Sequence, residues 1–314
     1  MLETFLATVS PMLVMFTCIL VGFLLRKGKV VPDNAATVLS KLELYVFLPA
    51  QIVSTFFRYC TVATLQAQYK LVLYGCVGVV LSAVMGFALA RLFSKDRDER
   101  SIYRYSLIIA NSGFLGNAIV SQILGAEALY SYMLFCMPLN VFLYSWAINS
   151  LIPREKGQGK PLWQRLLNPT LIALVCGIGL GLAGIGKVLP EFAWSVLDKL
   201  AGCMGPVAMV LTGIVIGDYR ILSLLKNKKV YVASLLRLLI LPGIIVAVLV
   251  LLGADRNVTL MAMFAYGAAL GLNTVVIPAA HDGDTHTGAA MAMISHGGAV
   301  LTIPLLYAIL TSIL

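Results

Sequence analysis

Long apolar runs constrain this chain more than any other feature. Ten runs of about 20 residues follow one another, and this is the length that an α-helix needs to cross a bilayer. About 60% of all residues are hydrophobic and only 12% are charged, a charged share well below that of ordinary soluble domains. The pattern predicts an all-α polytopic membrane protein with ten transmembrane helices. The runs cover roughly residues 5–25, 38–57, 69–92, 103–123, 129–150, 169–187, 193–216, 229–252, 259–280 and 287–312.

Lysine and arginine are concentrated in alternate loops. The loops after the first, third, fifth and seventh runs carry most of these residues, and the loop after the fourth run carries none. Cytoplasmic loops of membrane proteins are enriched in Lys and Arg. The bias therefore predicts a multi-pass protein of the cell (inner or plasma) membrane with both termini extracytoplasmic. The net charge of +9 then reflects orientation in a lipid bilayer, and no nucleic-acid partner is expected.

The two halves of the chain match weakly at one offset. Three pairs of residues are separated by 156 or 157 positions, which is about half of the 314 residues. Five runs in each half place the halves in opposite orientation, and such inverted repeats are a common plan of secondary transporters. The sequence therefore predicts two inverted five-helix repeats, residues 1–150 and 169–314, joined by a short cytoplasmic linker at 151–168. The matched pairs are Asn117 with Asn273, Arg100 with Arg256, and Pro49 with Pro206.

Two of the runs carry residues that weaken a membrane helix. The fourth contains Ala110–Val120, rich in Gly and Asn, and the ninth contains Gly271–Pro278. Interrupted helices at membrane depth are tolerated where they line a cavity, and paired interruptions point to a transporter's binding site. The predicted substrate-binding residues are Asn111, Asn117, Asn140, Asn273 and Thr274. The predicted hinge or crossover residues, where helices kink or break, are Gly113, Gly116, Pro278, Pro49 and Pro206.

An interrupted helix suits a negatively charged ligand. A helix that starts at a break presents free backbone N–H groups and a positive dipole end of about half a charge, and Asn side chains add neutral donors. Arg237, inside the eighth run, is a candidate charge partner for such a ligand. It could also snorkel to the interface or cap free carbonyl groups of a broken helix.

The histidines suggest a second class of function, that of a metal-dependent enzyme. His281, Asp282, Asp284 and His286 lie close together, and His296 follows in the last run. A metal-dependent membrane enzyme could use the His281/His286/His296 group, but the spacing fits no zinc motif, and a solvated cytoplasmic loop explains it more simply. The six cysteines are scattered with no Cys-x-x-Cys pair. We therefore expect no metal, no cofactor and no enzymatic activity.

Short motifs resemble those of the auxin efflux carrier family. They are Asn111-Ser-Gly-Phe-Leu-Gly116, Leu236-Arg-Leu-Leu-Ile-Leu-Pro242, and Asn273 with Pro278. The likeness extends over the whole chain, and the short central loop is similar to that of bacterial members. One departure is Asn117-Ala118, where the family usually has a proline. In this chain the first crossover is therefore expected to be broken by the two glycines of the motif alone.

The resemblance implies a fold and an activity. Runs 1, 2, 6 and 7 would form a scaffold, and runs 3–5 and 8–10 a transport domain that moves in an elevator-like cycle. The broken helices 4 and 9 would cross at the substrate site, and the scaffold would form a homodimer. Substrates of the family are small organic anions, among them indole-3-acetate in plants and dicarboxylates such as malate or malonate in bacteria.

The acidic residues bear on how transport would be driven. Glu43 and Asp198 lie near the starts of the second and seventh runs, away from the predicted breaks. A sodium site or proton relay normally uses a carboxylate near the substrate, so the sequence favours voltage-driven uniport of an organic anion by a permease. Sodium- or proton-coupled symport stays open because backbone carbonyls can also bind sodium. A receptor or channel on the same fold is a further alternative.

Overall fold

The computed structural model describes residues 2–153, 161–281 and 283–313, so part of the predicted 151–168 linker lies outside the described residues. Within these ranges the secondary structure is helical, as the apolar runs predicted. The helices of the first half are α1 (Leu2–Lys27), α2 (Ala35–Leu42), η1 (Glu43–Phe47), α3 (Leu48–Tyr59), α4 (Val62–Phe93), α5 (Arg97–Ile108), η2 (Ser112–Gly116), α6 (Asn117–Ile123), α7 (Ala126–Phe142), η3 (Leu143–Ala147) and η4 (Asn149–Leu151).

The second half follows a similar course after a short helix on the far side of the linker. Its helices are α8 (Leu162–Leu166), α9 (Pro169–Leu182), η6 (Ile185–Lys187), α10 (Glu191–Gly217), α11 (Ile221–Leu224), α12 (Lys228–Leu235), η7 (Leu236–Ile240), α13 (Leu241–Leu251), α14 (Arg256–Gly267), α15 (Asn273–Ala279) and α16 (His286–Ile313).

Eight helical segments among the described residues are long and apolar enough to cross a membrane. The two other predicted spans are the shorter apolar helix α9 and the interrupted pair α14 and α15. An interruption divides the apolar length between two helices, so neither α14 nor α15 reaches the 20 residues or so that a bilayer requires.

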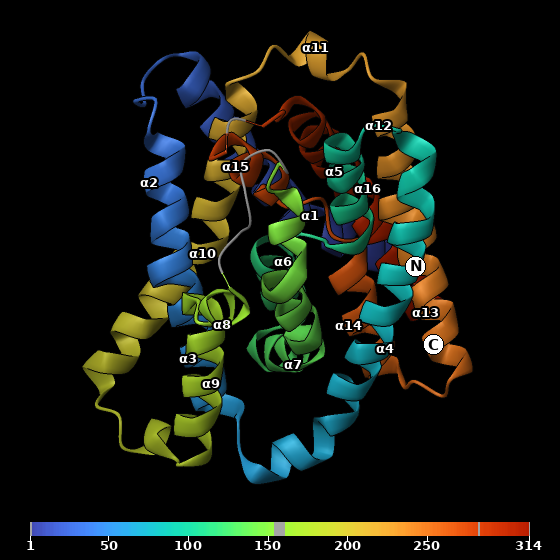
Figure 1. The fold of residues 1–314 in the computed structure, drawn as a ribbon. Coiled ribbons are helices and arrows are strands. Elements are labelled where there is room, and N and C mark those ends of the chain that lie inside the picture. The colour runs from blue at the N-terminus through green and yellow to red at the C-terminus, as the bar shows by residue number, and fades with distance from the viewer. Residues whose placement is uncertain (1, 154–160, 282, 314) are drawn as a thin grey trace.

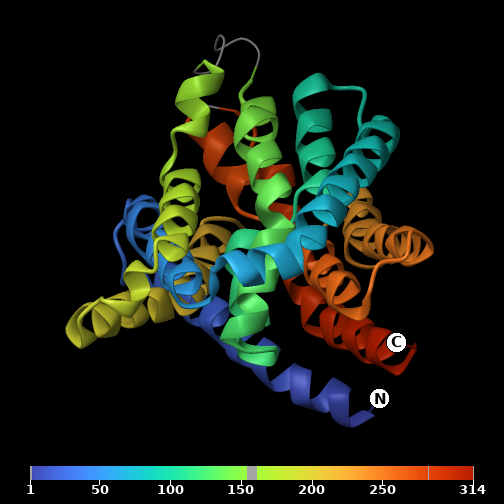
Figure 2. The same cartoon turned by 90° about the horizontal axis from the view of Figure 1, so that it is seen from below.

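The helices pack in two groups (Figures 1 and 2). In the first, called the α1/α10 group, α10 packs on α1, α2 and α3, and α9 packs on α3. In the second, called the α4/α16 group, α4 packs on α5, α7 and α13, while α16 packs on α12 and α14. Helix α1 also contacts α16, so the first helix of the chain lies between the groups.

Several long helices pass through a π-turn. The π-turns η1 and η7 each end two residues before a proline, Pro49 and Pro242. A proline ring has no N–H and clashes with the preceding turn of an α-helix, and a π-turn changes the hydrogen-bond register at that point. Pro49 therefore does not end its helix, which continues from Ala35 to Tyr59. Pro206 also lies inside a continuous helix, α10. Neither Pro49 nor Pro206 therefore breaks its helix.

The helices α1 and α10 approach each other closely through glycines. A Cβ atom built on Gly213 would lie 1.9 Å from the Ile19 carbonyl oxygen, and one on Gly22 would lie 2.0 Å from the Val210 carbonyl oxygen. Small residues allow such backbone contact between membrane helices. In a bilayer the hydrophobic effect does not drive helices together, and van der Waals contacts of this kind stabilise their packing instead.

Gly213→Ala tests this contact. The added methyl group meets backbone and cannot be accommodated by a rotamer change, so we expect a loss of about 1–3 kcal/mol of stability. The measurement is the apparent melting temperature of the purified protein in detergent. Gly202→Ala in the same helix is the matched control, because nothing lies within 4 Å of its Cβ position. Equal melting temperatures for the two variants would contradict the packing described.

Candidate functional site

Two breaks in helices meet inside the protein. The first, at residues 109–111, separates α5 from η2, and the second, at residues 268–272, separates α14 from α15. The Asn111 backbone N–H donates a hydrogen bond to the Ala269 carbonyl oxygen at 2.8 Å. A Cβ atom on Gly271 would lie 3.7 Å from the Asn111 Cα. The two unwound segments are therefore in direct contact, far apart as they are in the sequence.

The first break lies earlier than the glycines that were expected to cause it. Gly113 and Gly116 belong to the π-turn that follows the break. Gly116 is required for packing instead, because a Cβ there would lie 2.0 Å from the Tyr132 hydroxyl, whereas nothing lies within 4 Å of a Cβ on Gly113. The expectation that these glycines break the helix is wrong. The chain leaves the helix before them because Asn111 pairs with the other break.

The second break is held from two sides. The Leu270 N–H donates to the Ser295 hydroxyl of α16 at 3.0 Å, and the Thr274 hydroxyl donates to the Gly271 carbonyl at 3.3 Å. Pro278 lies within α15, after the break, and so is not part of the unwound segment. Side chains thus satisfy backbone groups that would otherwise be unpaired at this depth.

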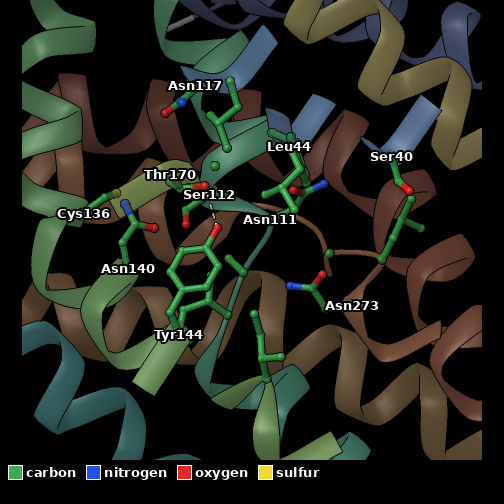
Figure 3. A pocket seen from close by; sticks show the side chains of 18 of the residues that line it. Ser40, Leu44, Asn111, Ser112, Asn117, Cys136, Asn140, Tyr144, Thr170 and Asn273 are labelled. Atoms are coloured by element: carbon green, nitrogen blue, oxygen red, sulfur yellow. Dashed lines mark hydrogen bonds between the residues drawn. The ribbon is translucent and has the colours of Figure 1, made fainter. Parts of the chain in front are cut away.

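A cavity of about 250 Å³ lies where the breaks meet, and residues from both helix groups line it (Figure 3). Four of the five predicted substrate-binding residues line it, namely Asn111, Asn117, Asn140 and Asn273. Thr274 does not line it, because its side chain is fully buried against its own turn. Most of the remaining wall is apolar, with contributions from Leu44, Leu48, Ile52, Met133, Leu143, Leu174, Leu211, Val276 and Ile277.

The asparagines differ in their hydrogen bonds. Asn117 donates to the Gln51 side chain of α3 at 3.0 Å, and Asn273 donates to the Tyr105 hydroxyl at 2.8 Å. The side-chain amides of Asn111 and Asn140 make no hydrogen bond to any other residue that the structure describes. These two amides are therefore free to bind a ligand, while the other two are already held in position.

Several lining residues were not predicted from the sequence. Lys41 and Ser40 of α2 line the cavity, and Lys41 is exposed and carries the one formal charge among the lining residues in the described parts of the chain. Tyr105 lines it as well, and Tyr144 shares a 2.8 Å hydrogen bond with Thr170. A lysine inside an apolar run was the one available sequence signal. Nothing in the local sequence marks the tyrosines.

Arg237 does not contact the cavity. Its side chain is completely buried in η7, and its Nε, Nη1 and Nη2 atoms have no hydrogen-bond partner among the described residues. Of the roles considered for it, Arg237 therefore neither snorkels to the membrane surface, nor caps free carbonyl groups of the described residues, nor lines this cavity. Tyr105, Tyr132 and Tyr266 are near enough to interact electrostatically with the guanidinium, but none of them accepts a hydrogen bond from it.

The histidines do not gather into a metal site. In the part of the chain that the structure describes, no three His, Cys, Asp or Glu side chains lie where they could hold a metal ion; Asp282 lies outside those residues. His296 is buried, with Nδ1 2.8 Å from the Ala292 carbonyl, and His286 has Nε2 3.4 Å from the Ser223 hydroxyl. The described geometry therefore gives the metal-enzyme hypothesis no support.

Comparison with known proteins shows the family of this chain. Residues 7–161 and 158–307 match the model of a family described as membrane transport protein. The chain is also 25% identical, over 243 residues, to an uncharacterized transporter of Methanothermobacter thermautotrophicus, and the alignment covers 76% of this chain and 77% of that protein. The family match extends over both helix breaks.

The cavity can be tested by thiol labelling. In a background in which the six native cysteines are replaced by alanine, we expect Ser40→Cys and Asn140→Cys to react with a water-soluble thiol reagent. Thr274→Cys should react at least about tenfold more slowly, because a thiol reacts as the thiolate, which needs contact with water. The labelling rate is followed by mass spectrometry. Equal rates at positions 140 and 274 would contradict the assignment of the cavity wall.

Proposed function

Because this chain belongs to the membrane transport protein family, whose auxin efflux carrier motifs its sequence carries, we propose that it is a permease that moves a small organic anion across the cell membrane. The observation that carries the proposal is the composition of the cavity at the two breaks. Its lining combines the free amides of Asn111 and Asn140 with the ammonium group of Lys41, and contains no carboxylate among the described residues. Such a site favours negative charge.

The shape of the cavity supports a small amphipathic acid. About 250 Å³ is near the lower end of the volumes of small-molecule sites. Polar side chains from both breaks and from α2, α7 and α9 line it, and the rest of the wall is mainly apolar. A monocarboxylate with an apolar body, such as indole-3-acetate, would place its carboxylate near the amides and its body against Leu44, Leu48 and Ile52. Malate and malonate would have to bury a second charge against this apolar wall, which is costly.

Alternating access would use the two helix groups. We propose that the α1/α10 group is the scaffold and, through contacts with a second copy, the homodimer interface, and that the α4/α16 group moves against it in an elevator-like cycle. In support, residues of both groups line the cavity, so relative motion of the groups would open and close it. Ten spans in two inverted repeats, with α9 and the α14–α15 pair as two of the ten, belong to the same proposal.

The orientation follows from the basic loops. With these loops in the cytoplasm and both termini outside, exposed Lys41 lies near the cytoplasmic end of its helix. The cavity would then face the cytoplasm, and Lys41 at its mouth would attract anions from that side. Export of a monovalent anion from an inside-negative cell releases about 2.3 kcal/mol of free energy per 100 mV of membrane potential. This free energy can drive uniport.

Proton-coupled transport is the second candidate, and Glu43 favours it. This residue is completely buried in η1, and neither carboxylate oxygen has a hydrogen-bond partner among the described residues. A buried carboxyl group without a partner is more stable when protonated, so it could carry a proton. Glu43 does not line the cavity, however, which leaves uniport as the simpler proposal. Glu43→Gln would abolish a pH-gradient drive and leave uniport unchanged.

Flux into proteoliposomes tests the proposed function. Purified protein is reconstituted, and uptake of labelled indole-3-acetate, malate and malonate is measured with an imposed potential, with and without sodium. We expect saturable, voltage-dependent uptake of the monocarboxylate without sodium. Asn111→Ala and Asn140→Ala should each reduce it by about tenfold or more, since a charge-assisted hydrogen bond is lost. No flux of any anion under any gradient would overturn the proposal, and flux that requires sodium at zero voltage would overturn uniport.

Lys41→Gln tests whether the charge of Lys41 attracts anions to the mouth of the cavity. We expect the KM for a carboxylate to rise about threefold or more, with little change in maximal rate, because a rim charge mainly raises the local concentration of anions. Lys226→Gln removes the same charge from an exposed loop residue that does not line the cavity, and should leave the KM unchanged. The effect of Lys41→Gln should also shrink as ionic strength increases.

A further inference from the structure

A buried cation in η7 is not used by the mechanism above. Arg237 is 0% exposed, and all three of its side-chain nitrogens lack a hydrogen-bond partner among the described residues. None of the described ion pairs includes it. Arginine keeps its charge in proteins, and an unpaired charge inside a membrane protein is costly and therefore usually serves function.

The surroundings of Arg237 connect it to both breaks. Its π-turn η7 packs against α5, α14 and α16, and its guanidinium interacts with the hydroxyls of Tyr105, Tyr132 and Tyr266. Tyr105 accepts the hydrogen bond of Asn273 at 2.8 Å, and Tyr132 donates one to the Ser112 carbonyl at 3.1 Å.

These two hydrogen bonds end on residues that line the cavity. Asn273 follows the second break directly, and Ser112 follows the first. One charged side chain therefore lies behind the tyrosines that hold the two walls of the candidate site. Tyr266 lies in the last turn of α14, just before the second break.

We propose that Arg237 is a positioning residue that gives the cavity its preference for anions without contacting them; this inference rests on the proposed function. The guanidinium acts through the layer of Tyr105 and Tyr132, in a water-poor interior where a charge is weakly screened. It makes the cavity electropositive across the hydroxyls that are bonded to Asn273 and Ser112.

The indirect arrangement suits a transporter. A direct arginine–carboxylate pair is a strong, often bidentate interaction, whereas a transported ligand must bind weakly enough to leave. A cation one layer behind the wall supplies attraction without such a pair.

A purely structural role makes a different prediction. An isolated charge in a low-dielectric interior costs free energy, and an apolar side chain of similar size removes this cost. We therefore expect Arg237→Met to melt at the same temperature as the native protein or higher, and to lose charge discrimination. A structural arginine would show the opposite result, with a lower melting temperature and unchanged discrimination.

The first test needs no substrate. Asn140→Cys in the cysteine-free background places a thiol in the cavity, and the pH at which its labelling reaches half of the maximal rate reports the local field. We expect Arg237→Met to move this midpoint upward by about 0.5–1 pH unit, because a nearby positive charge stabilises the thiolate. Arg237→Lys should largely retain the native midpoint. An unchanged midpoint in folded Arg237→Met would overturn the inference.

The second test uses the ligand. The affinities of indole-3-acetate and of its primary amide, indole-3-acetamide, are compared by competition against labelled indole-3-acetate uptake. We expect the ratio of carboxylate to amide affinity to fall about tenfold in Arg237→Met and to be largely retained in Arg237→Lys. Arg104→Gln is the control. It removes the same charge from α5, where the guanidinium lies 4.8 Å from the centroid of the Phe87 ring and does not line the cavity.

The two tests separate the two hypotheses. If the native protein transports no anion but the midpoint shifts, the proposed function fails and the electropositive cavity stands. If the native protein transports the acid and Arg237→Met changes neither the midpoint nor the affinity ratio, the proposed function stands and the role of Arg237 is overturned. A shift of equal size in Arg104→Gln would also overturn it, since net charge alone would then account for the effect.

Discussion

The hydrogen bond from the Asn111 N–H to the Ala269 carbonyl is the interaction on which the rest of the site depends. Backbone groups that leave a helix inside a bilayer must be paired within the protein, and here the two breaks pair with each other. The Ser295 hydroxyl completes the arrangement at Leu270. Because each break satisfies the other, neither can be repaired into a continuous helix without leaving its partner unpaired, and the cavity between them is retained.

The interior charges are arranged around this contact. Lys41 lies exposed at the cavity wall, and Arg237 is buried one layer behind it, beside Tyr105 and Tyr132. The lining contains no carboxylate among the described residues, while Glu43 is buried elsewhere, in η1. Positive charge near the breaks and the absence of negative charge in the described wall are the basis of the proposal that the ligand is an anion.

Packing differs between the interior of the α1/α10 group and its border with the other group. Within the group, Gly22 and Gly213 bring two backbones into contact that no larger residue would permit. At the border, the Asn117 amide donates to Gln51 across the candidate site. Glycine contacts of this kind fix two helices relative to each other. The border has more than this one contact, because Tyr144 shares a hydrogen bond with Thr170 of α9, and Gly205 of α10 lies close to Ala118 of α6.

The sequence by itself determined the helical class, the positions of the apolar segments and the existence of two interruptions, because these depend on local hydrophobicity and on the weakness of Gly and Asn in a helix. It also indicated the family through the motif at Asn111.

The sequence could not place the first break, since the glycines at 113 and 116 fit a π-turn as well as a break. Tertiary structure decided this, through the pairing of Asn111 with Ala269. Tertiary structure also separated Asn111 and Asn140, whose amides are free, from Asn117 and Asn273, whose amides are bonded. It placed Lys41 in the cavity wall and Arg237 outside it, because both positions depend on contacts between helices that are distant in the sequence.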